Sequence, residues 1–126
     1  MARLHVVALD ARLPAWAETA CAEYAKRMPK GYQVARVDSI PKKMKIVALD
    51  ERGKDLTTVQ FAELLKTETA FVIGGADGLD PEVRASAALL LRLSSLTLPH
   101  ALAQVVLLEQ IYRAATLLTG HPYHRA

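Results

Sequence analysis

The chain has 126 residues, of which 52% are apolar and 23% charged, with a formal net charge of +3. These values indicate one globular domain over residues 1–126 and exclude a disordered or fibrous protein. The single cysteine, Cys21, excludes an internal disulfide and a multi-cysteine zinc site, so we expect it to be a small buried side chain. The apolar runs are too short to span a bilayer and no signal-peptide pattern is present, so we expect a cytoplasmic protein without membrane contact.

Strand and helix patterns alternate along the chain. Short apolar runs predict strands buried on both faces, and apolar residues at helical spacing predict helices that begin near Pro14, Pro81 and a Thr57–Gln60 capping box. In chain order, the sequence predicts a strand at 4–9, a helix at 14–28, strands at 32–40 and 44–49, a helix at 57–66, a strand at 70–73, a helix from 80, a strand at 93–98 and a helix at 101–118. This alternation is typical of an α/β fold with a parallel sheet flanked by helices.

The link between the second and third predicted strands does not fit this scheme. Only Pro41-Lys42-Lys43 separates them, whereas a parallel crossover usually needs a dozen or more residues. A tight antiparallel hairpin favours Asn-Gly or Asp-Gly instead. We therefore expect a break in the chain between about Ile40 and Lys43, with a mobile segment missing. A continuous chain would require the second strand to be rearranged or antiparallel.

Two segments have the character of ligand loops. GGADG (74–78) joins a predicted strand to a predicted helix, where glycines admit a ligand to the backbone and the helix N-terminus favours an anion. It matches neither G-x-G-x-x-G nor a P-loop, so a plain tight turn is equally compatible. LSSLTLPH (93–100) fits either a strand with local side-chain hydrogen bonds or a backbone-lined slot at the carboxyl end of the sheet.

The last predicted helix, AQVVLLEQIYRAATLL, is apolar on more than one side. This pattern indicates deeper burial than a surface helix needs and favours a two-fold homodimer interface. Glu109 and Arg113 fit an i,i+4 surface pair, and the alternative is that Arg113 points into a site and engages phosphate or a base. His121 and His124 have no third ligand nearby, so we expect no metal site. His5 and His100 are expected to be structural.

Considered together, VALD, FVIGGADGL, LSSLTLPH, LLEQIYRA and HPYHR make the chain closely resemble the ribosomal large-subunit methyltransferase H family. The resemblance runs from VVALD to the last residues and is strongest from Phe71 onward. It implies a SPOUT-class enzyme that uses S-adenosylmethionine, without a metal, to methylate N3 of a pseudouridine in large-subunit (23S) ribosomal RNA of the assembled ribosome. It also implies a parallel sheet with a C-terminal trefoil knot, and an obligate homodimer.

The same resemblance implies a cofactor site in the knot, where backbone groups recognise the adenine. The cofactor-binding residues would be Leu49, Gly74, Leu93, Ser94, Ser95, Leu96, Thr97 and Leu98. A Gly74→Val substitution is then expected to exclude the cofactor while leaving the fold largely intact. Family members also carry a lysine-rich loop and a helix between the second and third strands, which this chain lacks.

We expect the C-terminal tail to be part of the active site. The tail of one subunit would lie over the cofactor of its partner in the dimer. The proton on the ring nitrogen must leave as the methyl group arrives, so catalysis needs alignment and a proton acceptor. His124, with an ordinary pKa of about 6.5, could be that acceptor. Tyr123, Arg125 and Arg113 are suited to hold an RNA loop.

Other functions are compatible with these residues. A SPOUT methyltransferase for tRNA or another rRNA base would share the knot and the cofactor, but not the HPYHR ending. A non-catalytic ribosome-binding protein of the same fold need not keep the cofactor slot. The strand and helix pattern alone also permits a nucleotide-binding α/β protein, although its phosphate motifs are missing.

Overall fold

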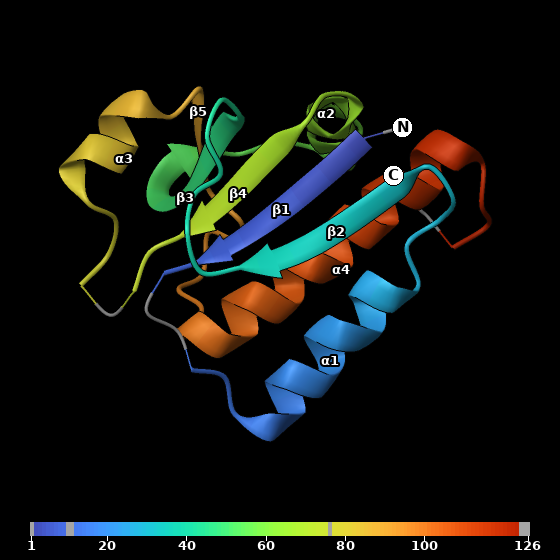
Figure 1. Cartoon of the computed structure of the whole chain (residues 1–126), viewed down its shortest axis with the longest axis horizontal. Helices are drawn as coiled ribbons and strands as arrows, with labels where there is room; N and C mark the ends of the chain where they lie inside the picture. The colour runs from blue at the N-terminus through green and yellow to red at the C-terminus, as the bar shows by residue number, and fades with distance from the viewer. Residues whose placement is uncertain (1, 10–11, 76, 124–126) are drawn as a thin grey trace.

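A computed structural model describes residues 2–9, 12–75 and 77–123. Its centre is a five-stranded sheet in the order β2-β1-β4-β3-β5, with all neighbouring strands parallel (Figure 1). The strands are β1 (Ala2–Ala8), β2 (Tyr32–Val37), β3 (Lys45–Lys54), β4 (Thr69–Ile73) and β5 (Leu89–Leu91); the helices are α1 (Ala15–Lys26), α2 (Thr58–Glu63) with a 3-10 turn (Leu64–Lys66), α3 (Pro81–Ser86) and α4 (His100–Thr119). The predicted parallel sheet flanked by helices is confirmed, and the trefoil knot stays a prediction.

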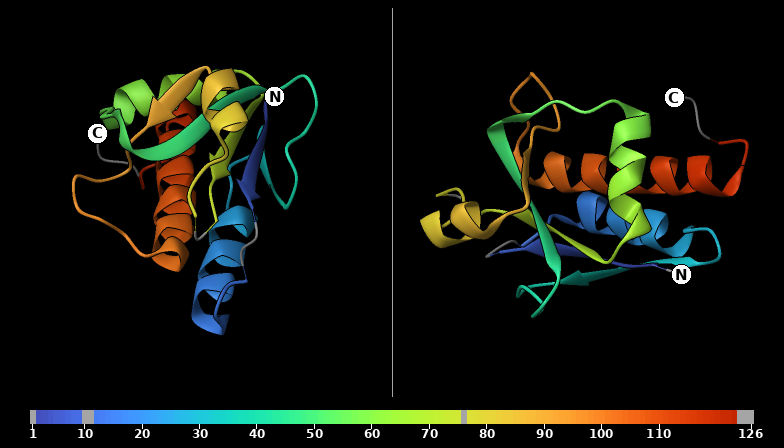
Figure 2. Two further views of the ribbon diagram at one scale, coloured as in Figure 1. Left: turned by 90° about the vertical axis from the view of Figure 1, so that its left-hand side faces the viewer. Right: turned by 90° about the horizontal axis from the view of Figure 1, so that it is seen from above.

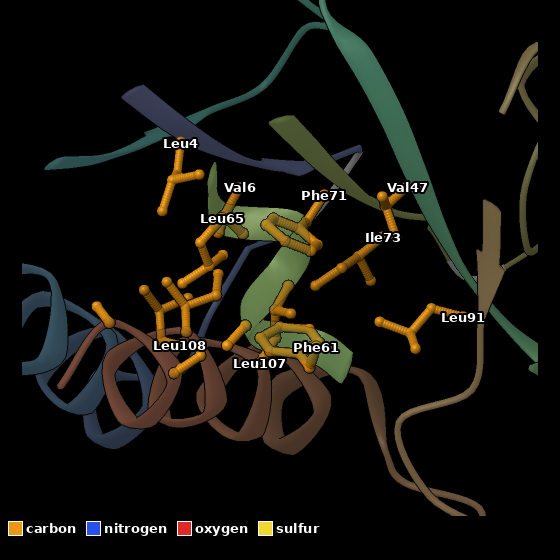
Figure 3. Close-up of a cluster of buried hydrophobic side chains, with 14 of the residues drawn as sticks. Leu4, Val6, Val47, Phe61, Leu65, Phe71, Ile73, Leu91, Leu107 and Leu108 are labelled. Atoms are coloured by element: carbon orange, nitrogen blue, oxygen red, sulfur yellow. The ribbon is translucent and has the colours of Figure 1, made fainter. Parts of the chain in front are cut away.

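One face of the sheet carries the main core, under α1, α2 and α4 (Figures 1 and 2). Successive strand residues point to opposite faces, so Val6 lies in this core and Val7 does not. Figure 3 shows the leucine, valine and phenylalanine side chains of this face meeting Leu107 and Leu108 of α4. Both leucines are fully buried. Because these two side chains are buried in the main core, α4 is a central helix of the fold.

The opposite face has a smaller cluster, which the link before β3 covers. Val7, Ala70 and Val72 are fully buried there. Ile40 and Met44 from the link pack against them, together with side chains from the loop before α3 and from α3 itself. The sheet is therefore covered on both faces, although only one face has long helices.

The expected break between Ile40 and Lys43 is wrong, because the chain runs continuously from β2 to β3 across the ends of β1 and β4 (Figure 1). β2 also remains parallel to β1. The registers place Lys45 level with Thr69, Leu4 and Val34, so the link returns only three residues along the sheet from Val37.

The distances explain why no helix is needed in this link. β2 and β3 are three strand spacings apart, or about 14 Å, and the return along the sheet is about 10 Å. Seven extended residues span up to about 23 Å, which exceeds the direct path of about 17 Å. Only residues 34–37 of β2 lie level with β3, at its residues 45–48, so the link does not have to return along the whole length of β2.

The fifth predicted strand was misplaced. β5 is Leu89–Leu91, and residues 93–98 form a loop. Leu91 pairs with both Leu49 and Lys54 of the irregular end of β3, and the ladder ends there. The Leu96 backbone N–H donates to Ser94 Oγ at 2.9 Å, a local bond that replaces a ladder bond.

The helix predictions hold. α1 buries Ala17 and Cys21, as predicted for the cysteine, whereas Trp16 is 57% exposed. α4 ends at Gly120, whose φ of 76° is left-handed. By length and composition α4 could cross a membrane, yet 44% of that apolar window is buried inside the protein. It is the helix on which the core is built.

The structure contains the capping box that the sequence predicts at Thr57–Gln60, at the start of α2. Thr57 Oγ1 accepts the Gln60 N–H at 3.2 Å, and Gln60 Oε1 accepts the Thr57 N–H at 2.9 Å. Thr57→Ala is expected to lower the free energy of unfolding by about 1 kcal/mol, measured by urea denaturation. Thr58→Ala, one position inside the helix, is the control and should change it less. Equal losses would contradict a capping role.

Candidate active site

A cavity of about 660 Å³ opens at the carboxyl-end edge of the sheet, beside β3, β4 and β5. This is the edge at which open α/β sheets bind ligands, and the volume is in the range of small-molecule sites. The wall consists of residues 49–52, 73–75, 77–79, Arg84, 91–94, 96–98, His100 and Ala103. Segments distant in sequence are thus brought to one site, which we call the strand-end cavity.

Most of the predicted cofactor residues line the strand-end cavity. Leu49 comes from β3, Gly74 follows β4, and the loop after β5 supplies Leu93, Ser94, Leu96, Thr97 and Leu98. Ser95 is not part of the wall. The Ser94 hydroxyl accepts the Leu96 N–H within this loop, so that side-chain oxygen already has a local partner. Backbone recognition of a ligand needs no distinctive side chain.

The glycine loop is a tight turn that also lines the cavity. The Gly78 N–H donates to the Gly75 carbonyl at 3.0 Å, and Gly78 has a left-handed φ of 81°. A Cβ on Gly74 would lie 2.5 Å from the Gly78 carbonyl carbon and 2.7 Å from the Leu79 nitrogen. The expectation that Gly74→Val leaves the fold intact is therefore wrong at this loop, because the valine would displace backbone before it met a ligand.

The strand-end cavity contains charges of both signs. Arg84 forms an ion pair with Asp50, whose side chain is only 8% exposed, and Asp50 Oδ1 also accepts the Arg52 backbone N–H at 2.7 Å. Arg92 Nε donates to Asp55 at 2.6 Å, a bond that lowers the pKa of the Asp55 carboxyl and raises the pKa of Arg92. Over residues 2–9, 12–75 and 77–123, no group of three potential metal ligands occurs.

The first turn of α4 holds a histidine at the cavity wall. Gln104 is 2% exposed, and its side-chain nitrogen lies 3.1 Å from Nε2 of His100. Buried amides need such partners. The pair thus orients the imidazole of His100, a residue expected from sequence to be only structural, beside the strand-end cavity.

The C-terminal cluster consists of Glu109, Tyr112, Arg113 and Tyr123. The Tyr123 hydroxyl donates to Glu109 Oε2 at 2.8 Å, and Arg113 Nε donates to the same oxygen at 3.1 Å. The Arg113 guanidinium lies 5.1 Å from the centre of the Tyr123 ring, which meets the Tyr112 ring edge-on at 4.6 Å between centroids. Glu109 and Arg113 are thus an i,i+4 pair, as the simpler interpretation predicts, and both side chains also contact Tyr123.

Within one chain, the C-terminal cluster is separate from the strand-end cavity. Ala103 lines the cavity, while Glu109 and Arg113 lie about 9 to 15 Å farther along the α4 axis. Neither Arg113 nor Tyr123 belongs to the cavity wall. His124 and Arg125, the other two predicted catalytic residues, lie outside the described residues. The structure therefore brings most of the predicted cofactor residues together, away from Arg113 and Tyr123.

Sequence analysis missed several polar groups of the strand-end cavity. Asp50 is the last residue of the quoted VALD motif, and His100 is the last of LSSLTLPH. Both residues directly follow apolar segments, and this position could have indicated the site, because the carboxyl ends of parallel strands meet at one edge of the sheet. Arg84 and Arg92 had no such signal, because only the packing of α3 and the end of β5 brings them to the cavity.

The chain is similar to a family of known methyltransferases. The family model described as "Predicted SPOUT methyltransferase" matches residues 35–124. Proteins named ribosomal RNA large subunit methyltransferase H are 43% identical in Burkholderia thailandensis, 44% in Paraburkholderia phymatum and 45% in Cupriavidus metallidurans, over 98% of this chain and 99% of theirs. The first alignment has 155 positions for a chain of 126 residues, so at least 29 positions of it have no residue here.

Solved structures share the fold at low sequence identity. A Bacillus anthracis protein described as an RNA methyltransferase superposes with a TM-score of 0.62, at 17% identity and over 98% of both chains. The SpoU methyltransferase AviRb of Streptomyces viridochromogenes, solved with AdoMet, gives a TM-score of 0.55 at 14% identity, over 99% of this chain and 59% of that one. These likenesses concern the fold alone.

The Tyr123–Glu109 bond predicts a pH dependence of stability. Burial and the bond to Glu109 raise the pKa of Tyr123 from 10.0 to about 12. The folded state then holds the phenol proton more tightly than the unfolded state, so this contribution to stability falls as pH rises from about 10 through 12. The difference in free energy of unfolding between the parent and Tyr123→Phe is expected to shrink from about pH 9 to about pH 11, measured by urea denaturation.

Tyr32→Phe is the matched control for alkaline effects elsewhere in the protein, because no hydrogen bond of the Tyr32 hydroxyl is seen among the described residues. A parent-to-Tyr123→Phe difference that stays constant over this pH range would contradict the inferred bond between Tyr123 and Glu109.

Proposed function

The chain belongs to the SPOUT methyltransferase family and, within it, to the ribosomal RNA large subunit methyltransferase H family, and from this membership we propose that it methylates N3 of a pseudouridine in large-subunit (23S) ribosomal RNA. S-adenosylmethionine is the methyl donor of SPOUT methyltransferases. The observation that carries the proposal is the strand-end cavity, in which seven of the eight residues expected to hold this cofactor lie around one space. We further propose that residues 1–126 act as one cytoplasmic SPOUT domain with a trefoil knot.

The strand-end cavity fits the cofactor in size and chemistry. Its volume of about 660 Å³ is enough for a nucleoside with an amino-acid arm. Leu49, Leu93 and Leu98 supply apolar surface for a purine, and the backbone of the two loops supplies donors and acceptors for its edge. The bound cofactor supplies an activated methyl group and its own leaving group, so the protein has to orient the two reactants and accept one proton.

We propose that the active site is completed across a homodimer. The separation of Arg113 and Tyr123 from the cavity of their own chain supports this arrangement. Leu102 of α4 is 37% exposed and Leu96 of the neighbouring loop is 76% exposed, and both are apolar surface that a second subunit would cover. The tail of one subunit would then lie over the cavity of the other.

The contacts of Tyr123 refine the roles proposed for the tail. Its hydroxyl is engaged by Glu109 and its ring by Arg113, so Tyr123 anchors the tail on α4. From this anchor, His124 would accept the proton from N3 and Arg125 would contact RNA, with Arg113 supporting the bound loop. A mutation that frees the anchor is then expected to weaken catalysis more than cofactor binding.

The test is mass spectrometry of rRNA nucleosides after incubation of unmodified ribosomes with the protein and S-adenosylmethionine. A monomethylated pseudouridine is expected. Ala103→Phe, which adds a large side chain to the cavity wall from α4, should reduce the product at least tenfold. Ala101→Phe, a substitution of the same kind on the same helix outside the cavity wall, is the control and should retain activity. Methylation of another nucleoside would favour another SPOUT specificity, and cofactor binding without product would favour a ribosome-binding protein.

Subunit mixing tests the arrangement across the dimer. Deletion of residues 123–126 is expected to abolish methylation and to spare dimerisation and cofactor binding. Mixing this inactive dimer with the inactive Ala103→Phe dimer should restore part of the activity, because one of the two sites in each heterodimer would be intact. Absence of recovery after verified subunit exchange would mean that each tail serves the cavity of its own chain.

A further inference from the structure

The strand-end cavity contains one ion pair whose two members both belong to its wall. Arg84 of α3 pairs with Asp50 of β3, and both residues line the cavity. The other pair nearby, Arg92 with Asp55, has only its arginine in the wall, and Asp55 is 63% exposed. Among the described residues of the wall, Asp50 and Arg84 are therefore the two oppositely charged side chains that are seen paired with one another.

The two partners are held very differently. The side chain of Asp50 is 8% exposed, and its Oδ1 is fixed by the Arg52 backbone N–H at 2.7 Å. Its other oxygen, Oδ2, is the one that meets Arg84. If Arg84 moves, the carboxylate keeps its orientation and presents Oδ2 to the cavity.

Arg84 is the more exposed member of the pair. Its side chain is 40% exposed, and α3 is a six-residue helix with none of its residues fully buried. A guanidinium on such a helix can shift by rotamer changes without disturbing the core. It also carries several donors in a planar fork, the geometry that suits a carboxylate.

We propose that Asp50 and Arg84 form the receptor for the amino-acid end of the cofactor, an assignment that rests on the function proposed above. That end is a zwitterion with an α-ammonium and an α-carboxylate. Asp50 Oδ2 accepts from the ammonium, and Arg84 donates to the carboxylate. In the empty site the two side chains neutralise each other, and binding exchanges one internal ion pair for two pairs with the ligand.

This exchange explains why a nearly buried carboxylate is tolerated in the cavity. A buried charge needs an opposite charge in both the free and the bound state. Arg84 provides it in the free state, and the ligand ammonium provides it in the bound state. The zwitterionic end of the ligand adds one charge of each sign, so Asp50 and Arg84 each keep an opposite charge in both states, which favours ligands that carry both of these charges over those that carry neither.

Two nucleosides distinguish this role by calorimetry. S-Adenosylhomocysteine retains the zwitterion, whereas 5′-methylthioadenosine has the same adenine, ribose and sulfur without it. The unmodified protein is expected to bind S-adenosylhomocysteine more tightly. Arg84→Gln should weaken that binding about tenfold or more and change the binding of 5′-methylthioadenosine less than about twofold. Asp50→Asn should show the same selectivity.

Arg92→Gln is the matched control, because Arg92 lines the same cavity and pairs with a carboxylate outside it. It should weaken both ligands equally or neither. Equal weakening of both ligands by Arg84→Gln and by Asp50→Asn, with unchanged thermal unfolding, would overturn the proposal in favour of a structural ion pair. If Arg92→Gln alone weakened the binding of S-adenosylhomocysteine selectively, the proposal would also be overturned, because Arg92 would then be the residue that binds the zwitterion.

The unmodified protein separates this inference from the proposed function. If it binds both nucleosides with equal affinity, the receptor assignment fails and the cofactor cavity stands. If it binds neither nucleoside, nor S-adenosylmethionine, the cofactor assignment of the strand-end cavity fails, and the receptor assignment fails with it.

Discussion

The burial of one face of α4 against the sheet is the constraint on which the other features depend. Leu107, Leu108 and Ile111 are fully buried there, beneath Val6 and Phe71. This packing fixes the first turn of α4 at the strand-end cavity and the later turns beneath the chain end. A single helix therefore sets both the distance and the direction between the strand-end cavity and the C-terminal cluster. It is also the reason that they do not meet within one chain.

A second constraint is the close approach of backbone segments around the cavity. Gly74 leaves no room for a Cβ beside the Gly78–Leu79 backbone, and Gly53 leaves none beside Leu90 and Leu91. Such contacts bring loops from three strands to one small space, so that backbone groups can form the wall. The charged side chains at the wall then add a pair of opposite charges, Asp50 on β3 and Arg84 on α3.

The link between β2 and β3 is shorter than the family resemblance implies, yet the parallel sheet still forms. The relatives have at least 29 aligned positions that are absent here, and the family resemblance implies a lysine-rich loop and a helix in this link. Partial overlap of β2 and β3 shortens the path, and Ile40 and Met44 cover the apolar side chains beneath it. The link leaves the carboxyl end of β2 and returns to the start of β3, and none of its residues 38–44 belongs to the wall of the strand-end cavity.

The local structure and the family membership could be predicted from the sequence alone. Apolar runs, the Thr57–Gln60 capping box, Pro81 and Gly120 specify elements through contacts between near neighbours, and the ordered motifs specify the family. Tertiary structure alone decided the course of the β2–β3 link, the end of β5 at Leu91, and the meeting of Asp50 with Arg84. It also decided that Tyr123 lies on Glu109 rather than at the cavity. These outcomes depend on strand order and register, which arise from contacts between residues far apart in the chain and leave no periodic pattern in it.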